Sequence, residues 1–433
     1  MEMKVLLTFI SIIFYWIFQG KYLVKFSQLC SYYLSKEDSY MNLEKTFLNT
    51  FLKNFDEENF EVDFWDGDKI LIGKGEPRFK VKINKPLNKK DLLSSTSLAF
   101  GEAYMNGDVE FEGDLFLVLD TVLKYMNKFT TDHKALPEIF HKFTNKSKQK
   151  EEVTSHYDIG NNFYSLWLDK TLSYSCAYFK NENDSLYEAQ MNKIHHILKK
   201  LNLKEGQSLL DIGCGWGMLL IEAAKKYKVK GLGITLSEEQ YKKFSERIKE
   251  EKLEDYLEVR IMDYRDLKKS HLSFDRIVSV GMIEHVGRPN YDLFFENVNV
   301  VLKNGGLFLL HYISGMKESE GDAWIKKYIF PGGMLPSLRE IIYISAEYNY
   351  HTIDVESLRL HYTKTLLEWY KNFNENIDKV KEMFDERFIR MWSLYLCSCA
   401  ATFNNGIIDL HQILFSKGIN NEISITRDYL YKE

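Results

Sequence analysis

Apolar and polar residues alternate with two different periods in the second half of this chain. Short apolar runs, typical of buried strands, are followed by stretches in which apolar residues recur every three or four positions, as in helices. Such repeated units predict an α/β fold with a doubly wound, mainly parallel sheet, which binds ligands at the carboxyl ends of its strands. Strands are expected at residues 208–212, 229–234, 257–261, 274–280 and 306–313, with helices ending at 227 and beginning at 237 and 291.

Beyond residue 313 the chain continues with an aromatic insertion. A long helix is predicted over residues 377–403, ended by Asn405-Gly406, and a closing strand over 410–415. This whole region, residues 154–433, is predicted to be one catalytic domain.

The first half has shorter runs. Alternating stretches at 60–65 and 78–83 are separated by turn signals, and helical periodicity follows at 92–105 and 115–129. We predict a small α+β domain over residues 41–143 and a linker over 144–153.

Lysines gather around the predicted linker, at Lys142, Lys146, Lys148 and Lys150. They form either a patch that contacts anionic lipid headgroups or a solvated connector, and the connector is favoured.

The first 40 residues contain an uncharged apolar run at 5–18. As a helix it would reach only ~21 Å, against a hydrocarbon core of ~30 Å. Two interpretations stay open: a membrane anchor that does not span the bilayer, or an extension ahead of a natural start at Met41.

Composition narrows the function classes. The chain is 45% hydrophobic and 15% aromatic, which suits either a pocket for an apolar substrate or simply a large aromatic core. A net charge of −5 without a basic helix argues against nucleic acid as a partner. Five cysteines without CxxC spacing predict neither a disulfide framework nor a metal centre, and fit a reducing cytoplasm.

A glycine-rich turn follows the first strand of the catalytic domain, in Asp211-Ile212-Gly213-Cys214-Gly215-Trp216-Gly217. Its glycines allow a tight turn and close approach of a ligand, and Asp211 can meet a cationic amino group. A dinucleotide site would need GxGxxG and an acidic residue closing the second strand. Here the third glycine, Gly217, lies one residue closer than that spacing requires, and the second strand ends without an acidic residue in Gly233-Ile234-Thr235-Leu236-Ser237. The turn therefore does not match a dinucleotide site.

Several further motifs accompany this turn. Together with His156-Tyr157-Asp158-Ile159-Gly160-Asn161, Tyr174-Ser175-Cys176-Ala177-Tyr178, Asp263-Tyr264-Arg265-Asp266 and Lys327-Tyr328-Ile329-Phe330-Pro331, the chain resembles cyclopropane-fatty-acyl-phospholipid synthases. The resemblance runs from about residue 156 to 417. Residues 41–143 resemble, more weakly, the N-terminal domain of bacterial members. The resemblance implies a class I methyltransferase fold and S-adenosylmethionine as cofactor.

The cofactor residues are assigned by the same resemblance. Thr235 has a second interpretation as a helix cap, and Tyr264 has one as a core aromatic. The full predicted set is Tyr174, Ser175, Asp211, Gly213, Gly215, Gly217, Thr235, Leu236, Gln240, Asp263, Tyr264 and Arg265.

The implied chemistry adds a methyl group to a lipid double bond, which leaves a carbocation that needs a dry pocket and a base. The resemblance implies bicarbonate as that base, held by Cys176, Glu284, His311, Ile313 and Tyr362. His285 is the main rival, as a direct base. Cys399 matches a cysteine suspected to be functional, although its surroundings favour a buried structural thiol. Five aromatic residues either form the walls of this pocket or pack in the ordinary core: Trp324, Tyr328, Phe330, Phe163 and Tyr164.

We therefore expect an enzyme that forms a cyclopropane ring on an unsaturated phospholipid, cytoplasmic and peripheral on the inner face of the membrane. Alternatives are a fatty-acid C-methyltransferase, a hydroxylating relative, or a lipid-binding module with a vestigial cofactor fold. Small-molecule N-methylation is disfavoured, because the bicarbonate set would have no purpose. Whether the protein is a homodimer stays open.

Overall fold

A computed structural model describes residues 48, 52–86, 95–125 and 160–431. Within these residues the chain divides into two compact units, one formed by residues up to 86 with 107–125 and one by 95–106 with 160–431. The predictions for residues 1–40, the linker 144–153 and its lysines lie outside the described residues.

The smaller unit contains a four-stranded sheet in the order β2-β1-β3-β4. Strands β1 and β2 form an antiparallel hairpin. The two predicted stretches, 60–65 and 78–83, contain β1 and β3, which pair parallel, and β3 also pairs antiparallel to β4. The elements are 3-10 helix η1 (Lys53–Phe55), β1 (Phe60–Asp63), β2 (Lys69–Ile72), β3 (Lys80–Ile83), β4 (Val109–Glu112) and α6 (Leu115–Lys124).

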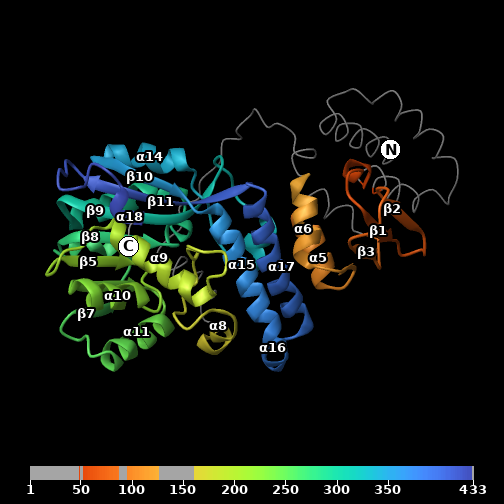
Figure 1. Cartoon of the computed structure of the whole chain (residues 1–433), viewed down its shortest axis with the longest axis horizontal. Coiled ribbons are helices and arrows are strands. Elements are labelled where there is room, and N and C mark those ends of the chain that lie inside the picture. The colour runs from red at the N-terminus through yellow and green to blue at the C-terminus, as the bar shows by residue number, and fades with distance from the viewer. Residues whose placement is uncertain (1–47, 49–51, 87–94, 126–159, 432–433) are drawn as a thin grey trace, which may run out of the picture. The chain divides into compact units, whose positions relative to one another are not determined.

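The larger unit is built on a seven-stranded sheet in the order β10-β11-β9-β8-β5-β6-β7 (Figure 1). The five strands from β9 to β7 run parallel, and β11 and β10 add two antiparallel strands at one edge. This confirms the predicted doubly wound fold. The strands are β5 (Ser208–Ile212), β6 (Lys230–Thr235), β7 (Leu257–Ile261), β8 (Phe274–Val280), β9 (Leu302–Gly315), β10 (Tyr350–Ser357) and β11 (Ile408–Lys417).

Helices cover both faces of this sheet. Alternate strand residues point to opposite faces, so Leu209 packs in one core with α9, α10 and α11, while Leu210 packs in another with α12 and α14. The helices that frame the sheet are α9 (Leu186–Lys200), α10 (Met218–Tyr227), α11 (Glu238–Glu250), α12 (Tyr291–Val301), α14 (Leu338–Glu347) and α18 (Asp428–Tyr431), with 3-10 turns η3 (Tyr264–Lys269), η4 (Ile283–His285) and η5 (Arg288–Asn290).

A second helical layer lies beside the sheet, where α15 and α17 run side by side (Figure 1). The pattern predicted one helix over 377–403, and this is wrong. The chain breaks at Phe384, and the Asp385 carboxylate accepts the Phe388 backbone N–H to begin a new helix. This layer contains α5 (Thr96–Met105), α8 (Asn161–Trp167), α13 (Ala323–Tyr328), α15 (Arg359–Glu375), α16 (Ile377–Met383) and α17 (Glu386–Asn404).

Helix α5 was predicted to belong to the N-terminal domain, but in the structure it belongs to the larger unit. It packs with α13 and α17 in the larger unit, where a Cβ on Gly101 would meet the Trp324 ring at 2.3 Å. The apolar periodicity predicted the helix, but its packing partners depend on the close approach of Gly101 to Trp324.

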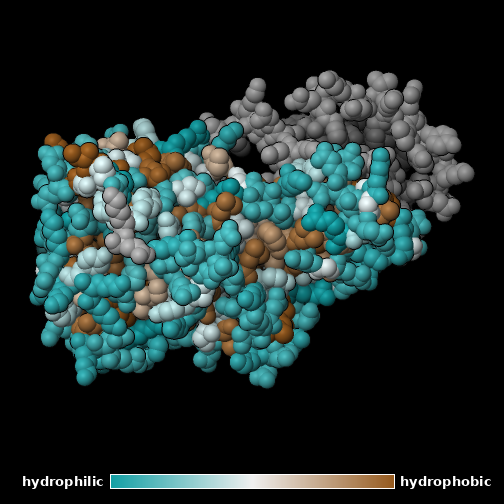
Figure 2. Space-filling view, viewed as in Figure 1, coloured by the Kyte–Doolittle hydropathy of each residue, from teal (hydrophilic) through white to brown (hydrophobic). Residues whose placement is uncertain are grey.

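The surface of the view in Figure 2 is mostly hydrophilic, with apolar side chains gathered over the α15–α17 layer. Leu360 on α15 and Met383 on α16 are among the exposed large apolar residues, at 59% and 42% exposure. Within the part of the chain that the structure describes, no helix is both long and apolar enough to cross a membrane.

Candidate active site

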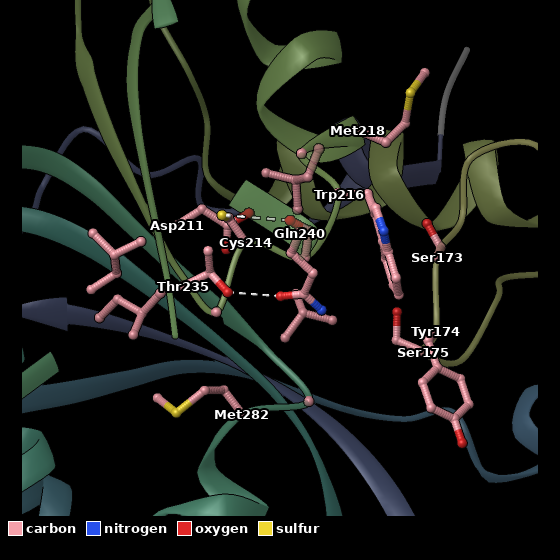
Figure 3. Close-up of a pocket in the computed structure, with 18 of the residues that line it drawn as sticks. Ser173, Tyr174, Ser175, Asp211, Cys214, Trp216, Met218, Thr235, Gln240 and Met282 are labelled. Atoms are coloured by element: carbon pink, nitrogen blue, oxygen red, sulfur yellow. Dashed lines mark hydrogen bonds between the residues drawn. The ribbon is translucent and has the colours of Figure 1, made fainter. Parts of the chain in front are cut away.

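A cavity opens at the carboxyl ends of β5, β6 and β8, where the strand order changes direction. Eleven of the twelve predicted cofactor residues line it, from the glycine turn, the end of β6, the start of η3 and the 171–175 segment. Figure 3 shows Tyr174, Ser175 and Trp216 on one side, facing Asp211, Cys214 and Thr235 on the other. The position is the one expected of a ligand site in a doubly wound sheet.

The glycines of the turn have distinct roles. All three have positive φ: 80° at Gly213, 55° at Gly215 and 83° at Gly217. A Cβ on Gly215 would meet nothing within 4 Å, so this backbone faces open space, whereas one on Gly217 would meet the buried Phe244 ring at 2.1 Å. Gly215 therefore leaves room for a ligand, and Gly217 lets α11 pack against the turn.

Asp211 lies at the base of the cavity and is 3% exposed. Its Oδ1 is buried and has no hydrogen-bond partner among the described residues. Burial raises the pKa of this carboxyl to about 7, against the opposing effect of the nearby Lys193 ammonium. A buried acceptor without a partner, next to the open Gly215 backbone, fits a cofactor that carries an ammonium group.

The far end of the cavity holds the residues predicted to bind the ribose and adenine. Thr235 Oγ1 donates to Gln240 Oε1 at 2.7 Å and accepts the Ser237 N–H at 3.1 Å. The cap of α11 is Ser237, whose hydroxyl accepts the Gln240 N–H. Thr235 is thus not the cap, and its side chain lies at the cavity.

Arg265 is the predicted cofactor residue that does not line the cavity. Its Nε and Nη2 donate to the two carboxylate oxygens of Asp263, at 2.9 and 2.6 Å. It therefore reaches the site only through Asp263. Tyr264 packs on Phe294 with ring centroids 5.5 Å apart, as a core aromatic does, and it also lines the cavity.

Side chains of α9 donate hydrogen bonds to the segment that carries Tyr174 and Ser175. Gln190 Nε2 donates to the Ser175 carbonyl at 2.9 Å, and Lys193 Nζ donates to Ser175 Oγ at 2.9 Å. Tyr174 forms a 2.7 Å hydroxyl–hydroxyl hydrogen bond with Tyr395 of α17. Lys193 lines the cavity and was missed from the sequence, although a lysine on the buried face of a helix was a usable signal.

Two of the residues predicted to hold the anion interact with Glu284: Ile313 through a hydrogen bond and Tyr362 through its charge. Glu284 Oε1 accepts the Ile313 N–H at 2.8 Å, while its Oε2 is buried with no partner among the described residues. Burial raises the pKa of Glu284 to about 7. His311 lies two residues before Ile313 on β9, so the two positions share a face of the sheet.

His311 is 1% exposed, and burial lowers its pKa well below the usual value, so the ring is neutral. Gln412 Nε2, on the neighbouring strand β11, donates to His311 Nδ1 at 3.1 Å. Nε2 of the same ring is buried without a partner in the described part of the chain. With Gln412 Nε2 as the donor, the one hydrogen of the neutral imidazole is on Nε2, whereas the opposite amide orientation, which would pair the buried Gln412 Oε1, puts it on Nδ1.

Tyr362 and Cys176 complete the predicted set. Burial raises the pKa of Tyr362 well above its usual value, and the nearby Cys176, Glu284 and Cys399 raise it further. Cys176 is fully buried, with Sγ 3.2 Å from the Ala177 carbonyl oxygen. Both groups keep their hydrogens at neutral pH, and Tyr362 lies near both Cys176 and Glu284.

The remaining candidates fall in different places. His285 lines the cofactor cavity, and burial lowers its pKa to about 4. Cys399 is partly exposed as a residue, but its thiol is buried enough to raise its pKa to about 12. The five predicted wall aromatics do not line the cofactor cavity; Phe163 packs edge-on to Trp392 at 5.0 Å, and Tyr328 donates to Glu102 at 2.6 Å.

Within the described residues, no group of three or more His, Cys, Asp or Glu side chains is arranged to hold a metal ion.

Comparison with known proteins decides the family. Mycolic acid cyclopropane synthetases match residues 144–413, and a domain family of unknown function matches residues 47–134. The chain belongs to the mycolic acid cyclopropane synthetase family. This confirms the resemblance drawn from the motifs.

Relatives within and around this family cover most of the chain. A probable fatty acid methyltransferase of Pseudomonas putida is 38% identical and covers 86% of this chain and 96% of its own length. A cyclopropane-fatty-acyl-phospholipid synthase of Escherichia coli is 39% identical over 80% of this chain and 90% of its own. The solved mycolic acid cyclopropane synthase CmaA1, complexed with SAH and CTAB, is 34% identical, with a TM-score of 0.58, 62% of this chain covered and 98% of that one.

Family membership and the cavity together establish the enzyme class. This family member has the class I methyltransferase fold and is an S-adenosylmethionine-dependent transferase, as predicted. The roles of individual residues stay predictions.

Proposed function

We propose that this enzyme builds a cyclopropane ring on the double bond of an unsaturated phospholipid acyl chain, with bound bicarbonate as the base. It would act on the inner face of the cytoplasmic membrane. The observation that carries this proposal is the pair of buried, unpartnered atoms Glu284 Oε2 and His311 Nε2, in a family whose cofactor donates a methyl group.

S-adenosylmethionine supplies an electrophilic methyl group. The alkene forms a bond from one carbon to that methyl carbon, S-adenosylhomocysteine leaves, and the other alkene carbon becomes a cation. Loss of a proton from the transferred methyl lets its C–H electron pair close the ring. This last step needs a base and a cavity without free water.

The groups around Glu284 fit a small anion with one hydroxyl. Glu284 Oε2 is free to accept a hydrogen bond, so it suits the anion's hydroxyl, while His311 Nε2–H suits one of its oxygens. The Ile313 N–H, already bonded to Glu284 Oε1 at 2.8 Å, orients the carboxylate. When bound here, bicarbonate would supply the base, since the lowered pKa of His311 makes that ring a weak proton acceptor.

A direct base role suits His285 less well. Its pKa is lowered to about 4 by burial, so it accepts a proton weakly near neutral pH. Glu284 keeps one oxygen in a hydrogen bond with the backbone, which also argues for a holding role.

A second candidate is fatty-acid C-methylation, because the Pseudomonas putida relative is named a probable fatty acid methyltransferase. It shares the cofactor and the cation and differs in the final step. A product that keeps an alkene or gains a hydroxyl would favour it or a hydroxylating variant over cyclopropanation.

The test is incubation of the purified full-length enzyme with S-adenosylmethionine, bicarbonate and vesicles of a monounsaturated phospholipid, followed by mass spectrometry and proton NMR of the lipid. We expect a gain of one methylene, loss of the alkene signal and appearance of ring protons. Cofactor binding without any change of the lipid would instead favour a lipid-binding module. Turnover of the free fatty acid but not the phospholipid would reject the phospholipid substrate.

A further inference from the structure

Helix α9 carries polar side chains on its buried face. Gln190, Lys193, His196 and Lys200 follow one another at intervals of three or four residues, so they share one side of the helix, and each is less than 5% exposed. Such a face is normally apolar. Each of these side chains therefore needs a polar partner to offset its desolvation.

The two buried lysines of this face differ in their partners. Lys200 Nζ lies 2.5 Å from Glu356 Oε2 and 3.2 Å from Asp354 Oδ2. Lys193, in contrast, has no carboxylate oxygen within 4.0 Å of Nζ among the described residues, and its hydrogen bond goes to the Ser175 hydroxyl at 2.9 Å. Asp169 and Asp211 favour the charged form of Lys193 only from beyond that distance, and burial lowers its pKa to about 8. An anion that comes close to this ammonium would therefore stabilise its charged form.

The cofactor cavity is where such an anion can arrive. Lys193, Ser175 and Asp211 all line it. Because Lys193 donates to Ser175 Oγ, the hydrogen of that hydroxyl is left to donate elsewhere. Ser175 faces the cavity across from Asp211 (Figure 3). The cavity thus offers a cation with a hydroxyl donor and, separately, a carboxylate with an unpartnered oxygen.

This arrangement matches the amino-acid end of the cofactor, which carries one carboxylate and one ammonium group. We propose that Lys193 and the Ser175 hydroxyl bind the cofactor's carboxylate, while Asp211 receives its ammonium. The proposal rests on the cofactor assignment of the cavity and is independent of the lipid reaction and of bicarbonate.

The experiment compares two ligands in isothermal titration of the full-length protein: S-adenosylhomocysteine and its decarboxylated analogue. Wild type should prefer the carboxylate-bearing ligand. In Lys193→Met the affinity for S-adenosylhomocysteine should fall about 10- to 100-fold, the range of a charge-assisted hydrogen bond, with little change for the analogue. Lys193→Arg keeps the charge and should recover most of the preference.

Two controls separate this role from a structural one. Lys225→Met, at an exposed position of α10, should change neither affinity. Asp211→Asn should weaken both ligands, since both carry the ammonium. Equal losses for the two ligands in Lys193→Met, or no loss for either, would overturn the proposal. If Lys193→Met does not fold, two other results would overturn the proposal. One is wild-type enzyme that binds both ligands equally, and the other is a Lys193→Arg variant that loses the preference.

Discussion

The glycine turn and the groups around Glu284 are assembled in opposite ways. The turn is one segment, residues 211–217, whose positive φ angles and open Gly215 backbone follow from the glycines themselves. Glu284, His311, Gln412 and Tyr362 instead come from η4, β9, β11 and α15, which meet only in the folded protein. A local motif defines the cofactor site, whereas sheet register and helix packing would define the proposed anion site.

This difference predicts that the two sites fail in different ways. Damage to the turn should affect folding and cofactor binding together, because its glycines are also packing positions. Damage to the proposed anion site should leave cofactor binding intact and reduce mainly the chemistry.

The largest effect is expected for Glu284→Gln. The amide oxygen can still accept the Ile313 N–H, but its NH₂ group replaces the acceptor Oε2 with a donor. Turnover on phospholipid vesicles should fall about 10³-fold, within the range for loss of acid–base catalysis, with affinity for S-adenosylhomocysteine unchanged. A variant that retains near-normal turnover would show that the carboxylate has no part in the reaction. Glu254→Gln, at an exposed position, serves as control.

Gly217→Ala should destabilise the fold. Its Cβ would meet Phe244, which is fully buried and cannot move away, and its φ of 83° adds backbone strain. We expect a loss of about 3 kcal/mol in the free energy of unfolding, together with weaker cofactor binding. Gly206→Ala is the matched control, because Gly206 has a φ of 79° and open space around it, and should cost only about 1 kcal/mol. Equal losses for the two variants would contradict the packing role.

Stability should depend on pH through Glu284. Burial raises its pKa from 4.5 to about 7, so the native state binds this proton more tightly than the unfolded chain. The contribution is present below about pH 4.5 and is lost as pH rises through about 7, which amounts to about 3 kcal/mol. Denaturant unfolding of wild type and Glu284→Gln from about pH 5 to pH 8 measures it, since the variant lacks this titration. If the free energy of unfolding changes with pH in the same way for both proteins, Glu284 does not have a raised pKa.

Gln412→Leu should have a smaller effect, because it removes only the group that fixes the hydrogen on His311 Nε2. We expect about a tenfold loss of turnover, the size of one hydrogen bond, with a higher bicarbonate requirement. Nitrogen-15 NMR of histidine-labelled protein should show hydrogen on Nε2 of His311 in wild type and a mixture of tautomers in the variant. Hydrogen on Nδ1 in wild type would reverse the proposed orientation.

The smallest effect is expected for Cys399→Ala. Burial raises the pKa of this thiol to about 12, so it stays protonated and is a poor nucleophile. Turnover should change less than about threefold, measured in the same vesicle assay. A loss comparable with that of Glu284→Gln would place Cys399 in the reaction.

The strands at the centre of the sheet were predictable because each is a short apolar run with a clear end. Strands β5, β7 and β8 have the predicted limits. The long helical pattern at 377–403 failed, since apolar periodicity continues across Phe384 while the local Asp385 cap begins a new helix. Lys193 was missed from the sequence, and only the structure shows that it donates to Ser175 and lines the cavity.

By itself the sequence determined the doubly wound core, the glycine turn and the family, since these depend on local periodicity, backbone conformation and contiguous motifs. Only the tertiary structure decided that α5 packs with α13 and α17, that Arg265 binds Asp263, and that Lys193 is left without a carboxylate partner. Those outcomes depend on contacts between residues far apart in the chain, and such contacts are fixed by packing and by the need to pair buried polar groups.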